Sequence, residues 1–244
     1  MSFIDKTNIV IKKNNNDLYY FDIDKDIVLT KINNKNDILL PKILFTGDYS
    51  FVDIWLDTNE KDNIYGIIND KKGKILNLNI EEDNIDKHTM IKYNYKNFIV
   101  KFPYTKHIYN IKHTIYYSIN KSIPLLANLI HIYEDDNIYV KNTIDFIDYN
   151  ILSNFVVAYS NNRPIIFYFK LVEELFVSTF DLNSRSWSKP IQITKSNKNK
   201  IYLSVLQDES SNYHIVFSEN HDNKYYCKYV NISLENNFLK INQE

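Results

Sequence analysis

The chain has 244 residues and a formal net charge of −1, and 44% of its residues are hydrophobic, which is enough for a sizeable buried core. Its opposite charges are interspersed, which argues against a nucleic-acid surface, and no apolar run nears the ~18 residues that a membrane-spanning helix needs. Ile occurs 36 times, Asn 34 times and Ala twice, and because Ile suits strands while Asn is a mediocre helix former, the composition favours an all-β fold.

Five segments of the chain share one pattern, which is an apolar run, a polar turn and a second apolar run. They begin near Asn8, Asn63, His113, Arg163 and Tyr213, and the last four lie 50 residues apart. A period of about 40–50 residues that contains only strands is typical of β-propeller blades. The sequence therefore predicts one domain, a five-bladed β-propeller with four-stranded antiparallel blades near residues 1–48, 49–97, 98–150, 151–199 and 200–244.

Each blade needs a first strand before this hairpin and a fourth strand after it. We expect first strands at Phe51–Leu56, Ile99–Phe102, Phe155–Tyr159 and Tyr202–Leu206. We expect fourth strands at Ile27–Ile32, His88–Tyr93, Tyr139–Ile144, Trp187–Thr194 and Phe238–Ile241. The first copy has no room for a full first strand before Asn8. Either the segment Ser2–Asp5 or the C-terminal strand would complete it.

Several of these strands do not alternate between apolar and polar residues. Ile165–Phe169 and Leu175–Val177 are apolar throughout. Strands buried on both faces read this way, and a propeller blade is covered by a neighbour on each face. A two-sheet sandwich, the alternative fold, would alternate more clearly. The turns use Asn and Asp in place of Gly, as at Asn161-Asn162, because Asn tolerates the left-handed backbone region.

Residue supply excludes several kinds of chemistry. With three glycines, the chain has no phosphate-binding loop and no Gly-x-Ser-x-Gly nucleophile elbow. Its six histidines are scattered, so we expect neither a metal nor any other cofactor, although His214 and His221 could converge across a hairpin. Cys227 cannot form an internal disulfide and is expected to be a small buried residue. No secretory signal is visible, so we expect a cytoplasmic protein, with a cell-surface or spore location by another route left open.

The segment Phe180–Pro190 joins an expected third strand to an expected fourth strand. Asp181 is followed by a short polar turn and then by Trp187. This segment resembles the Asp-box of the sialidase-like superfamily, Ser-x-Asp-x-Gly-x-x-Trp, with one additional residue between Asp and Trp and without the Gly. Galactose-oxidase and Kelch-type blades carry a similar phrase. The resemblance implies a propeller in which Asp181 forms the turn and Trp187 packs, both in structural roles.

Sialidase activity itself is not expected. The resemblance implies three arginines around the substrate carboxylate, because a planar guanidinium matches a carboxylate. This chain has only Arg163 and Arg185, and Arg185 lies in the Asp-box-like turn. A degenerate propeller without the sialidase arginines is therefore the reading that the resemblance supports.

Aromatic side chains on the expected first strands offer flat faces for sugar rings or peptide side chains. We predict a non-enzymatic binding or assembly module for a carbohydrate or protein ligand held at one end of the central channel. The candidate ligand-binding residues are Asp53, Trp55, Tyr104, Tyr159, Asn220 and His221. Packing of the aromatic residues between blades is the competing interpretation.

Two other functions stay open at this point. A glycoside hydrolase or lyase on the same fold would place two carboxylates opposite each other at the channel mouth. The chain could also be the N-terminal domain of a longer assembly protein.

Overall fold

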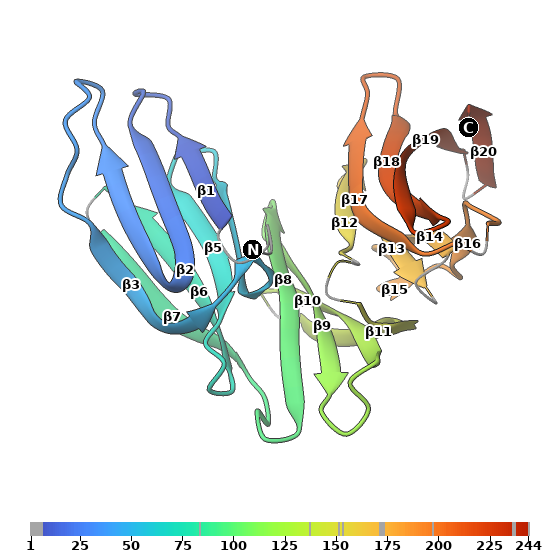
Figure 1. The fold of residues 1–244 in the computed structure, drawn as a ribbon, viewed down its shortest axis with the longest axis horizontal. Helices are drawn as coiled ribbons and strands as arrows, with labels where there is room; N and C mark the ends of the chain where they lie inside the picture. The colour runs from blue at the N-terminus through green and yellow to red at the C-terminus, as the bar shows by residue number, and fades with distance from the viewer. Residues whose placement is uncertain are drawn as a thin grey trace. The chain divides into compact units, whose positions relative to one another are not determined.

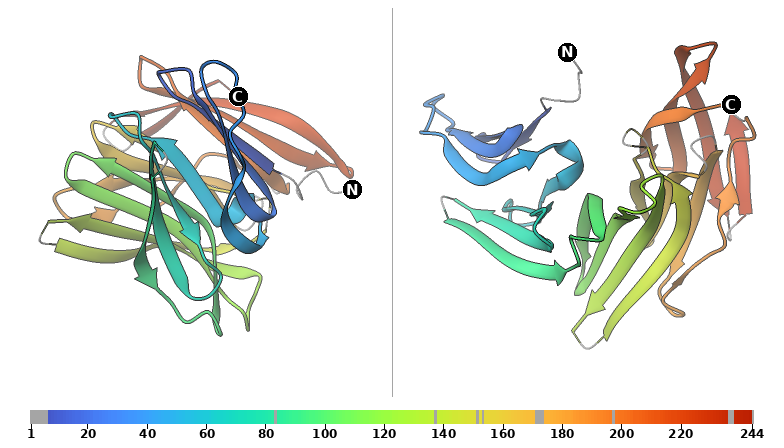
Figure 2. Two further views of the ribbon diagram at one scale, coloured as in Figure 1. Left: turned by 90° about the vertical axis from the view of Figure 1, so that its left-hand side faces the viewer. Right: turned by 60° about the horizontal axis from the view of Figure 1, so that its bottom comes forward.

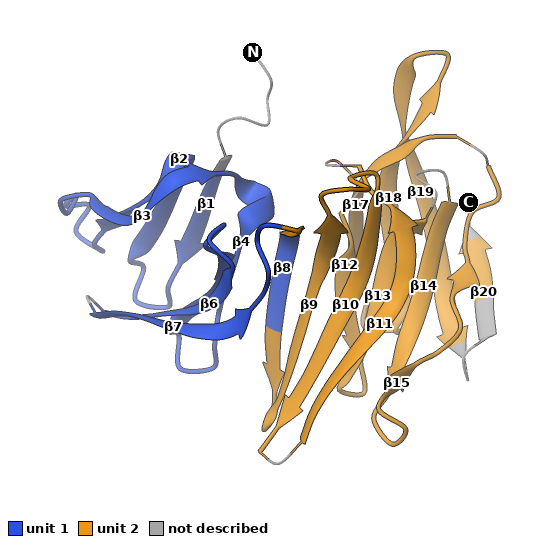
Figure 3. Ribbon diagram, turned by 90° about the horizontal axis from the view of Figure 1, so that it is seen from below, with its two compact units in different colours: residues 1–96, 100–105 blue, residues 97–99, 106–244 orange. Residues whose placement is uncertain are grey.

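The computed structural model describes residues 7–82, 84–136, 138–150, 152, 154–170, 174–196, 198–235 and 238–243. Contacts divide the chain into two compact units, coloured blue and orange in Figure 3. Unit 1 comprises residues 1–96 and 100–105, and unit 2 comprises residues 97–99 and 106–244. The expectation of one domain stays a prediction.

Five antiparallel sheets follow one another along the chain, from blue to red in Figure 1. The first contains β1 (Thr7–Lys12), β2 (Leu18–Ile32) and β3 (Lys42–Tyr49), and the second contains β4 (Ile54–Thr58), β5 (Ile64–Asn69), β6 (Lys74–Glu81) and β7 (Asn84–Lys92). The third contains β8 (Phe98–Ile108), β9 (Ile111–Asn120), β10 (Leu126–Asp135) and β11 (Ile138–Asp148). The fourth contains β12 (Val156–Ser160), β13 (Arg163–Lys170), β14 (Glu174–Asp181), β15 (Ser186–Trp187) and β16 (Ile191–Gln192). The fifth contains β17 (Lys200–Gln207), β18 (Asn212–His221), β19 (Lys224–Glu235) and β20 (Phe238–Gln243).

This arrangement confirms the predicted fold class, a five-bladed β-propeller. The strands of each sheet follow chain order and form a meander of hairpins (Figure 2), except that β16 of the fourth sheet pairs with β14. Asn and Asp do stand in for Gly at the turns. Asn161 and Asn162, between β12 and β13, have φ values of 50° and 62°, and Asp222 and Asn223, between β18 and β19, have φ values of 53° and 64°. Two successive residues in this region are typical of a tight hairpin turn.

The core of unit 1 lies between its first two sheets. Alternate residues of β2 are buried on both sides of Asp24-Lys25-Asp26, which is the alternation of a strand with one face in a core. These side chains pack with aliphatic residues of the second sheet, and the buried set includes Tyr19, Phe21, Ile23, Ile27, Leu29, Ile54, Ile64, Ile68, Leu78 and Ile80. Full burial of each large apolar side chain contributes roughly 1.5–3 kcal/mol.

In unit 2, β13 is buried on both faces. All five residues of Ile165–Phe169 are buried, because β13 contacts β11 of the third sheet and β17 of the fifth. The continuous apolar run in the sequence therefore has the cause expected for a blade with a neighbour on each face.

The first sheet differs from the expectation for its outer strand. Ile27–Ile32 is not a separate fourth strand but the second half of β2, and the outer strand is β3. The polar triplet Asp24-Lys25-Asp26 interrupts the apolar pattern, yet the chain continues through it. Lys25 adopts a φ of 66° and the register with β3 shifts there, so the triplet forms a bulge instead of a turn.

Other strand boundaries also need correction. Phe51–Asp53, expected at the start of a strand, form the 3-10 helix η1, whose N-cap is Ser50. The expected strand Trp187–Thr194 is broken into β15 and β16, with Pro190 between them, because proline has no N–H to donate to a sheet. The C-terminal strand β20 pairs with β19, so it belongs to the fifth sheet. The segment Ser2–Asp5 lies outside the described residues.

Cys227 and the two histidines of the fifth sheet were also assigned wrongly. Cys227 is exposed, because β20 pairs only with the later part of β19, from Asn231 onward, and leaves the strand around Cys227 uncovered. His214 and His221 lie seven residues apart on the single strand β18. At about 3.4 Å per residue they are roughly 24 Å apart and cannot share a metal ion.

Candidate functional site

Three aromatic side chains of unit 1 form a cluster that we name the Trp55 platform, which consists of Trp55 on β4, Tyr65 on β5 and Tyr104 on β8. The ring centroids of Trp55 and Tyr104 lie 4.8 Å apart, and those of Trp55 and Tyr65 lie 5.6 Å apart, both with edge-on geometry. All three side chains are half-buried. The structure thus brings together two of the residues that the sequence singled out, Trp55 and Tyr104, and adds Tyr65.

A carboxylate borders this platform. The pairing of β4 with β5 places Asp57 directly opposite Tyr65, and the Tyr65 hydroxyl donates a hydrogen bond of 3.4 Å to Asp57 Oδ2. Burial, together with the charge of Asp57, raises the pKa of Tyr65 well above its usual range, so the phenol keeps its proton. The cluster therefore combines flat apolar faces with a hydroxyl and a carboxylate oxygen, groups that bind the two sides of a sugar ring.

The close approach of β5 to β4 depends on Gly66, which lies opposite Leu56. A Cβ atom at Gly66 would collide with the carbonyl oxygen of Trp55 and lie 2.5 Å from a methyl carbon of Leu56. Gly66 is thus required for the backbone position of Trp55.

Asp53 lies in the same unit but is fully buried, with 0% of its side chain exposed. Its carboxylate accepts hydrogen bonds of 3.0 Å from the backbone N–H and the hydroxyl of Ser50. Lys101 and Lys71 place their Nζ atoms 2.8 Å and 2.9 Å from its two oxygens. Asp53 therefore ties the start of η1 to Lys101 of β8 and to Lys71 of the turn between β5 and β6, and the side chains of these lysines remain partly exposed.

Tyr159, on β12 of unit 2, is half-buried beside a pair of histidines. The ring of His113 lies 6.4 Å from that of Tyr159 and stacks on the ring of His131 at 5.3 Å. His113 Nδ1 lies 3.0 Å from His131 Nε2, and Trp187 Nε1 lies 3.0 Å from His131 Nδ1. Trp187 of the Asp-box-like segment thus packs inside the unit, while Asp181 accepts backbone hydrogen bonds from Asn183 and Ser184, as turn formers do.

Trp187, His131 and His113 form a chain of hydrogen bonds that we name the histidine relay. The indole of Trp187 determines which ring nitrogens in it carry protons. Because an indole N–H can only donate, His131 Nδ1 must accept, and His131 then donates from Nε2 to His113 Nδ1. Neutral His113 therefore carries its proton on Nε2. That atom is buried without a hydrogen-bond partner in the described part of the chain. Burial lowers the pKa of His113 to about 4, and it lowers the pKa of His131 well below its usual range, so both rings are neutral near pH 7.

The last two candidates, Asn220 and His221, close β18 at its hairpin turn. The Asn220 side chain accepts a hydrogen bond from the backbone N–H of Asn223, and His221 Nε2 lies 2.6 Å from Glu219. Glu219 also pairs with buried Lys200 at 3.2 Å. Burial alone would raise the pKa of Glu219, but hydrogen bonds from Ser196, His221 and Lys200 hold it below the usual range. Asn220 and His221 lie on β18 of the fifth sheet, whereas Tyr159 lies on β12 of the fourth.

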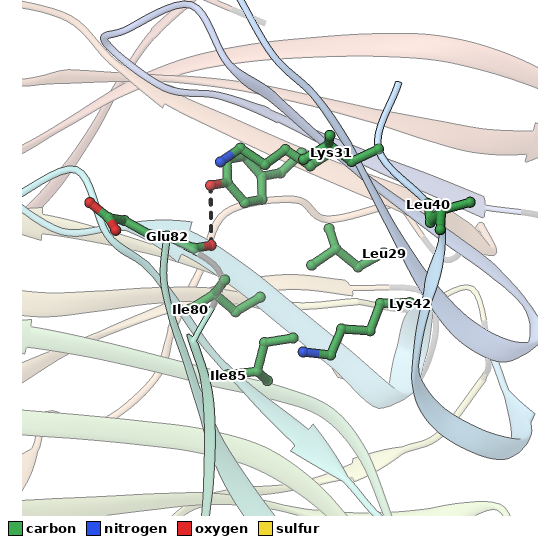
Figure 4. Close-up of a pocket in the computed structure, with 9 residues that line it drawn as sticks. Leu29, Lys31, Leu40, Lys42, Ile80, Glu82 and Ile85 are labelled. Carbon is green, nitrogen blue, oxygen red and sulfur yellow. Dashed lines mark hydrogen bonds between the residues drawn. The ribbon is translucent and has the colours of Figure 1, made fainter. Parts of the chain in front are cut away.

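Each unit also contains a cavity. The cavity of unit 1, of about 260 Å³, is lined mainly by aliphatic side chains, with Leu29, Ile80 and Ile85 pointing into it in Figure 4. At its rim the Tyr19 hydroxyl donates to the carbonyl oxygen of Glu82 at 3.4 Å. None of the predicted site residues lines it. The cavity of unit 2, of about 330 Å³, is lined mainly by polar side chains that include Arg163 and Tyr213.

Within the described ranges, no group of three or more His, Cys, Asp or Glu side chains could hold a metal ion. No helix in that part of the chain is long and apolar enough to cross a membrane.

The sequence singled out Trp55 and Tyr104 but did not predict Tyr65, His113 or His131 as part of any site. The signal for Tyr65 was present, since the hairpin between β4 and β5 sets Asp57 opposite it. The contact of His131 with Trp187 spans 56 residues and has no local signature.

No protein-family model matches the chain, and no curated protein does so either. Several solved structures, however, are similar to this chain in fold. An ulvan lyase of polysaccharide lyase family PL25 has a TM-score of 0.64 at 8% identity, over 98% of this chain and 73% of that chain. The NanB sialidase of Streptococcus pneumoniae (K499G mutant) has a TM-score of 0.52 at 10% identity, over 85% of this chain and 36% of that chain.

A third solved structure extends the likeness. A triple arginine mutant of AofleA from Arthrobotrys oligospora has a TM-score of 0.54 at 7% identity, over 98% of this chain and 71% of that chain. At such low sequence identity, these similarities are evidence about the fold alone. The chain is thus similar in fold to propeller proteins, among them a polysaccharide lyase and a sialidase.

Proposed function

We propose that this chain is a carbohydrate-binding β-propeller whose ligand, a polysaccharide, stacks on the Trp55 platform. The observation that carries the proposal is the half-buried cluster of Trp55 and Tyr104, with a carboxylate at its border. Rigid aromatic rings bind apolar sugar faces at little entropic cost, and Asp57 would accept hydrogen bonds from sugar hydroxyls. Two of the similar structures are an ulvan lyase and a sialidase, which supports a glycan as the ligand class.

Asp53 has an indirect role in this proposal. Because its carboxylate is buried, it would position Lys101 and Lys71 instead of contacting the ligand. A protein ligand, the other class expected from the sequence, would need a broader apolar surface than three half-buried rings provide.

Affinity electrophoresis through gels containing single polysaccharides, neutral and acidic, tests the proposal. One polysaccharide should retard the wild-type protein. Trp55→Ala should weaken that binding by about tenfold or more, as truncation of a central aromatic anchor does. Trp55→Phe keeps an aromatic face and should lose less. Tyr139→Ala, which removes an aromatic ring that is 61% exposed in unit 2, is the control.

Retardation that is equal for Trp55→Ala and Tyr139→Ala would show that the platform is not the binding surface. A protein that binds no polysaccharide in the panel would contradict the proposed function as a whole.

A second candidate function, cleavage of the bound polysaccharide, is favoured by the cluster around Tyr159. His113 presents a buried N–H without a partner in the described residues, next to a tyrosine that is half-buried. In an elimination on a uronate, a base removes the proton from the carbon beside the carboxylate. The glycosidic C–O bond then breaks, a C=C bond forms, and the released oxygen takes up a proton. Tyr159 is our candidate for the proton transfer, and His113, whose Nε2 can only donate, is a positioning residue.

Ultraviolet absorbance of the new double bond would detect such cleavage, and reducing-end release without this absorbance would indicate hydrolysis. Tyr159→Phe removes only the hydroxyl and should abolish elimination while gel retardation persists. Retardation without either product, for the wild-type protein, would leave binding as the function and reject cleavage.

A further inference from the structure

The cavity of unit 2 lies between two neighbouring hairpin turns. One is the Asn161-Asn162 turn, whose pairing places Arg163 opposite Ser160. The other is the turn between β17 and β18, where Ser211 adopts a φ of 63°. Both turns join the first strand of a sheet to its second strand. The cavity of about 330 Å³ between them is near the lower end of the volumes of small-ligand sites.

Its lining combines one guanidinium with several hydroxyl groups. Arg163 lines the cavity together with Ser160, Thr179, Ser211 and Tyr213. Tyr213 is buried, and its burial raises the pKa of its phenol, although a hydrogen bond from Ser160 and the charge of Arg163 act in the opposite direction. The phenol is therefore protonated near pH 7.

The charge of Arg163 is not neutralised by an ion pair in the part of the chain that the structure describes. Two carboxylates, Asp181 and Asp208, lie on nearby turns, and neither forms an ion pair with Arg163 within the described residues. Asp181 Oδ1 accepts hydrogen bonds from Asn183 and Ser184 of its own turn. These hydrogen bonds, and to a smaller extent the charge of Arg163, lower the pKa of Asp181. Asp208 lies 3.1 Å from His214 Nε2 and accepts the backbone N–H of Asn212 at 2.8 Å.

We propose that this cavity is an oxyanion site that binds one acidic sugar unit through Arg163. A planar guanidinium matches the two oxygens of a carboxylate or a sulfate with paired hydrogen bonds, and the surrounding hydroxyls donate to the remaining oxygens. Neither Ile165 nor Leu234, which complete the lining, adds a charge that would oppose an anion. The oxyanion would be a uronate carboxylate or a sulfate ester of the polysaccharide. This assignment of the anion to a sugar rests on the proposed function.

Small probes test the site without any polysaccharide. Isothermal titration at constant ionic strength would compare sodium sulfate, sodium glucuronate and glucose with the wild-type protein. We expect binding of sulfate, glucuronate or both, and much weaker binding of glucose. Arg163→Gln should weaken anion binding by about tenfold or more, as expected when a charged hydrogen-bonding partner is lost. Arg163→Lys keeps the charge without the planar fork and should give an intermediate loss.

Two further variants make the test specific. Thr179→Val removes one lining hydroxyl and should weaken the same anion to a smaller extent. Lys189→Gln removes an exposed positive charge of the same unit and should leave the affinity unchanged. Sulfate preferred to glucuronate would identify a sulfate ester as the source, and the reverse preference would identify a uronate.

Equal anion affinity in the wild type and in Arg163→Gln would overturn the inference, and so would equal losses in Arg163→Gln and Lys189→Gln. A different result would contradict the proposed function without contradicting this inference. Trp55→Ala should leave the affinity for sulfate and glucuronate unchanged. If the wild-type protein binds these anions but no polysaccharide, the oxyanion site is supported and the Trp55 platform is rejected as a glycan-binding surface.

Discussion

Replacement of Asp53 by alanine removes a carboxylate that forms ion pairs with two lysines of unit 1. In the wild-type protein the carboxylate is fully buried, 2.8 Å from Lys101 Nζ and 2.9 Å from Lys71 Nζ. It also accepts the backbone N–H of Ser50 at the start of η1. Asp53→Ala therefore leaves two ammonium groups near each other and one backbone donor without its acceptor.

The expected loss of unfolding free energy is about 3 kcal/mol. Removal of one partner from a buried ion pair typically costs about 3–5 kcal/mol. The low end of that range applies because the lysine side chains remain 18% and 33% exposed and can be partly hydrated. Asp53→Asn keeps an oxygen for Ser50 and should lose about 2 kcal/mol. Lys101→Met combined with Asp53→Ala should cost little more than Asp53→Ala alone, because the two residues act as one pair.

Urea unfolding followed by tryptophan fluorescence measures this loss. The chain has two tryptophans, of which Trp55 belongs to unit 1 and Trp187 to unit 2. In a Trp187→Phe background, Trp55 alone reports on unit 1. Asp48→Asn, which changes an exposed carboxylate on β3, is the control and should stay within about 0.5 kcal/mol of its parent.

A loss for Asp53→Ala no larger than that for Asp48→Asn would refute the reasoning. The carboxylate would then not anchor η1, and a direct role of Asp53 in ligand binding would need to be considered again.

Three further changes have outcomes that follow from the structure. As the pH is lowered from 6.5 to about 4, His113 should account for a loss of stability of about 3 kcal/mol, because burial keeps its folded-state pKa at about 4 and the unfolded chain takes up the proton first. His113→Gln should flatten this part of a urea-midpoint profile against pH, and an unchanged slope would contradict the assignment. Gly66→Ala should cost about 1–3 kcal/mol and weaken polysaccharide binding, since the new methyl group displaces the backbone of Trp55; a normal melting temperature with normal gel retardation would be inconsistent with that collision. Trp187→Phe removes the hydrogen bond to His131 and should lower the free energy of unfolding of unit 2 by about 1–3 kcal/mol, measured by chemical denaturation with tyrosine fluorescence, whereas an unaltered midpoint would show that the relay contributes no stability.

The repeat made the fold predictable from sequence. Each 50-residue copy carries its own hairpin, so the pattern that specifies one blade is stated several times and its period sets the number of blades. The sequence did not predict strand boundaries correctly where one local pattern is compatible with two structures. Asp24-Lys25-Asp26 resembles a turn, but a single residue with positive φ lets β2 continue, and the polar stretch after Asn33 concealed the outer strand β3.

The candidate site was predictable only in part. Trp55 was recognisable because an aromatic residue between two carboxylates on a first strand is unusual, and Asp57 follows from the hairpin register. The partners that define each role come from distant segments, such as Lys101, which is 48 residues from Asp53. Local patterns specify strands, whereas contacts between sheets depend on how the sheets pack, so the burial of Asp53 and the histidine relay could not be read from the sequence.

The most direct measurement of the central claim is a crystal structure of the protein soaked with an oligosaccharide from the polysaccharide that retards it. The account predicts a sugar ring stacked on Trp55 next to Tyr104, with a hydroxyl group within hydrogen-bond distance of Asp57. An oligosaccharide bound elsewhere, with Trp55 and Tyr104 uncovered, would contradict it.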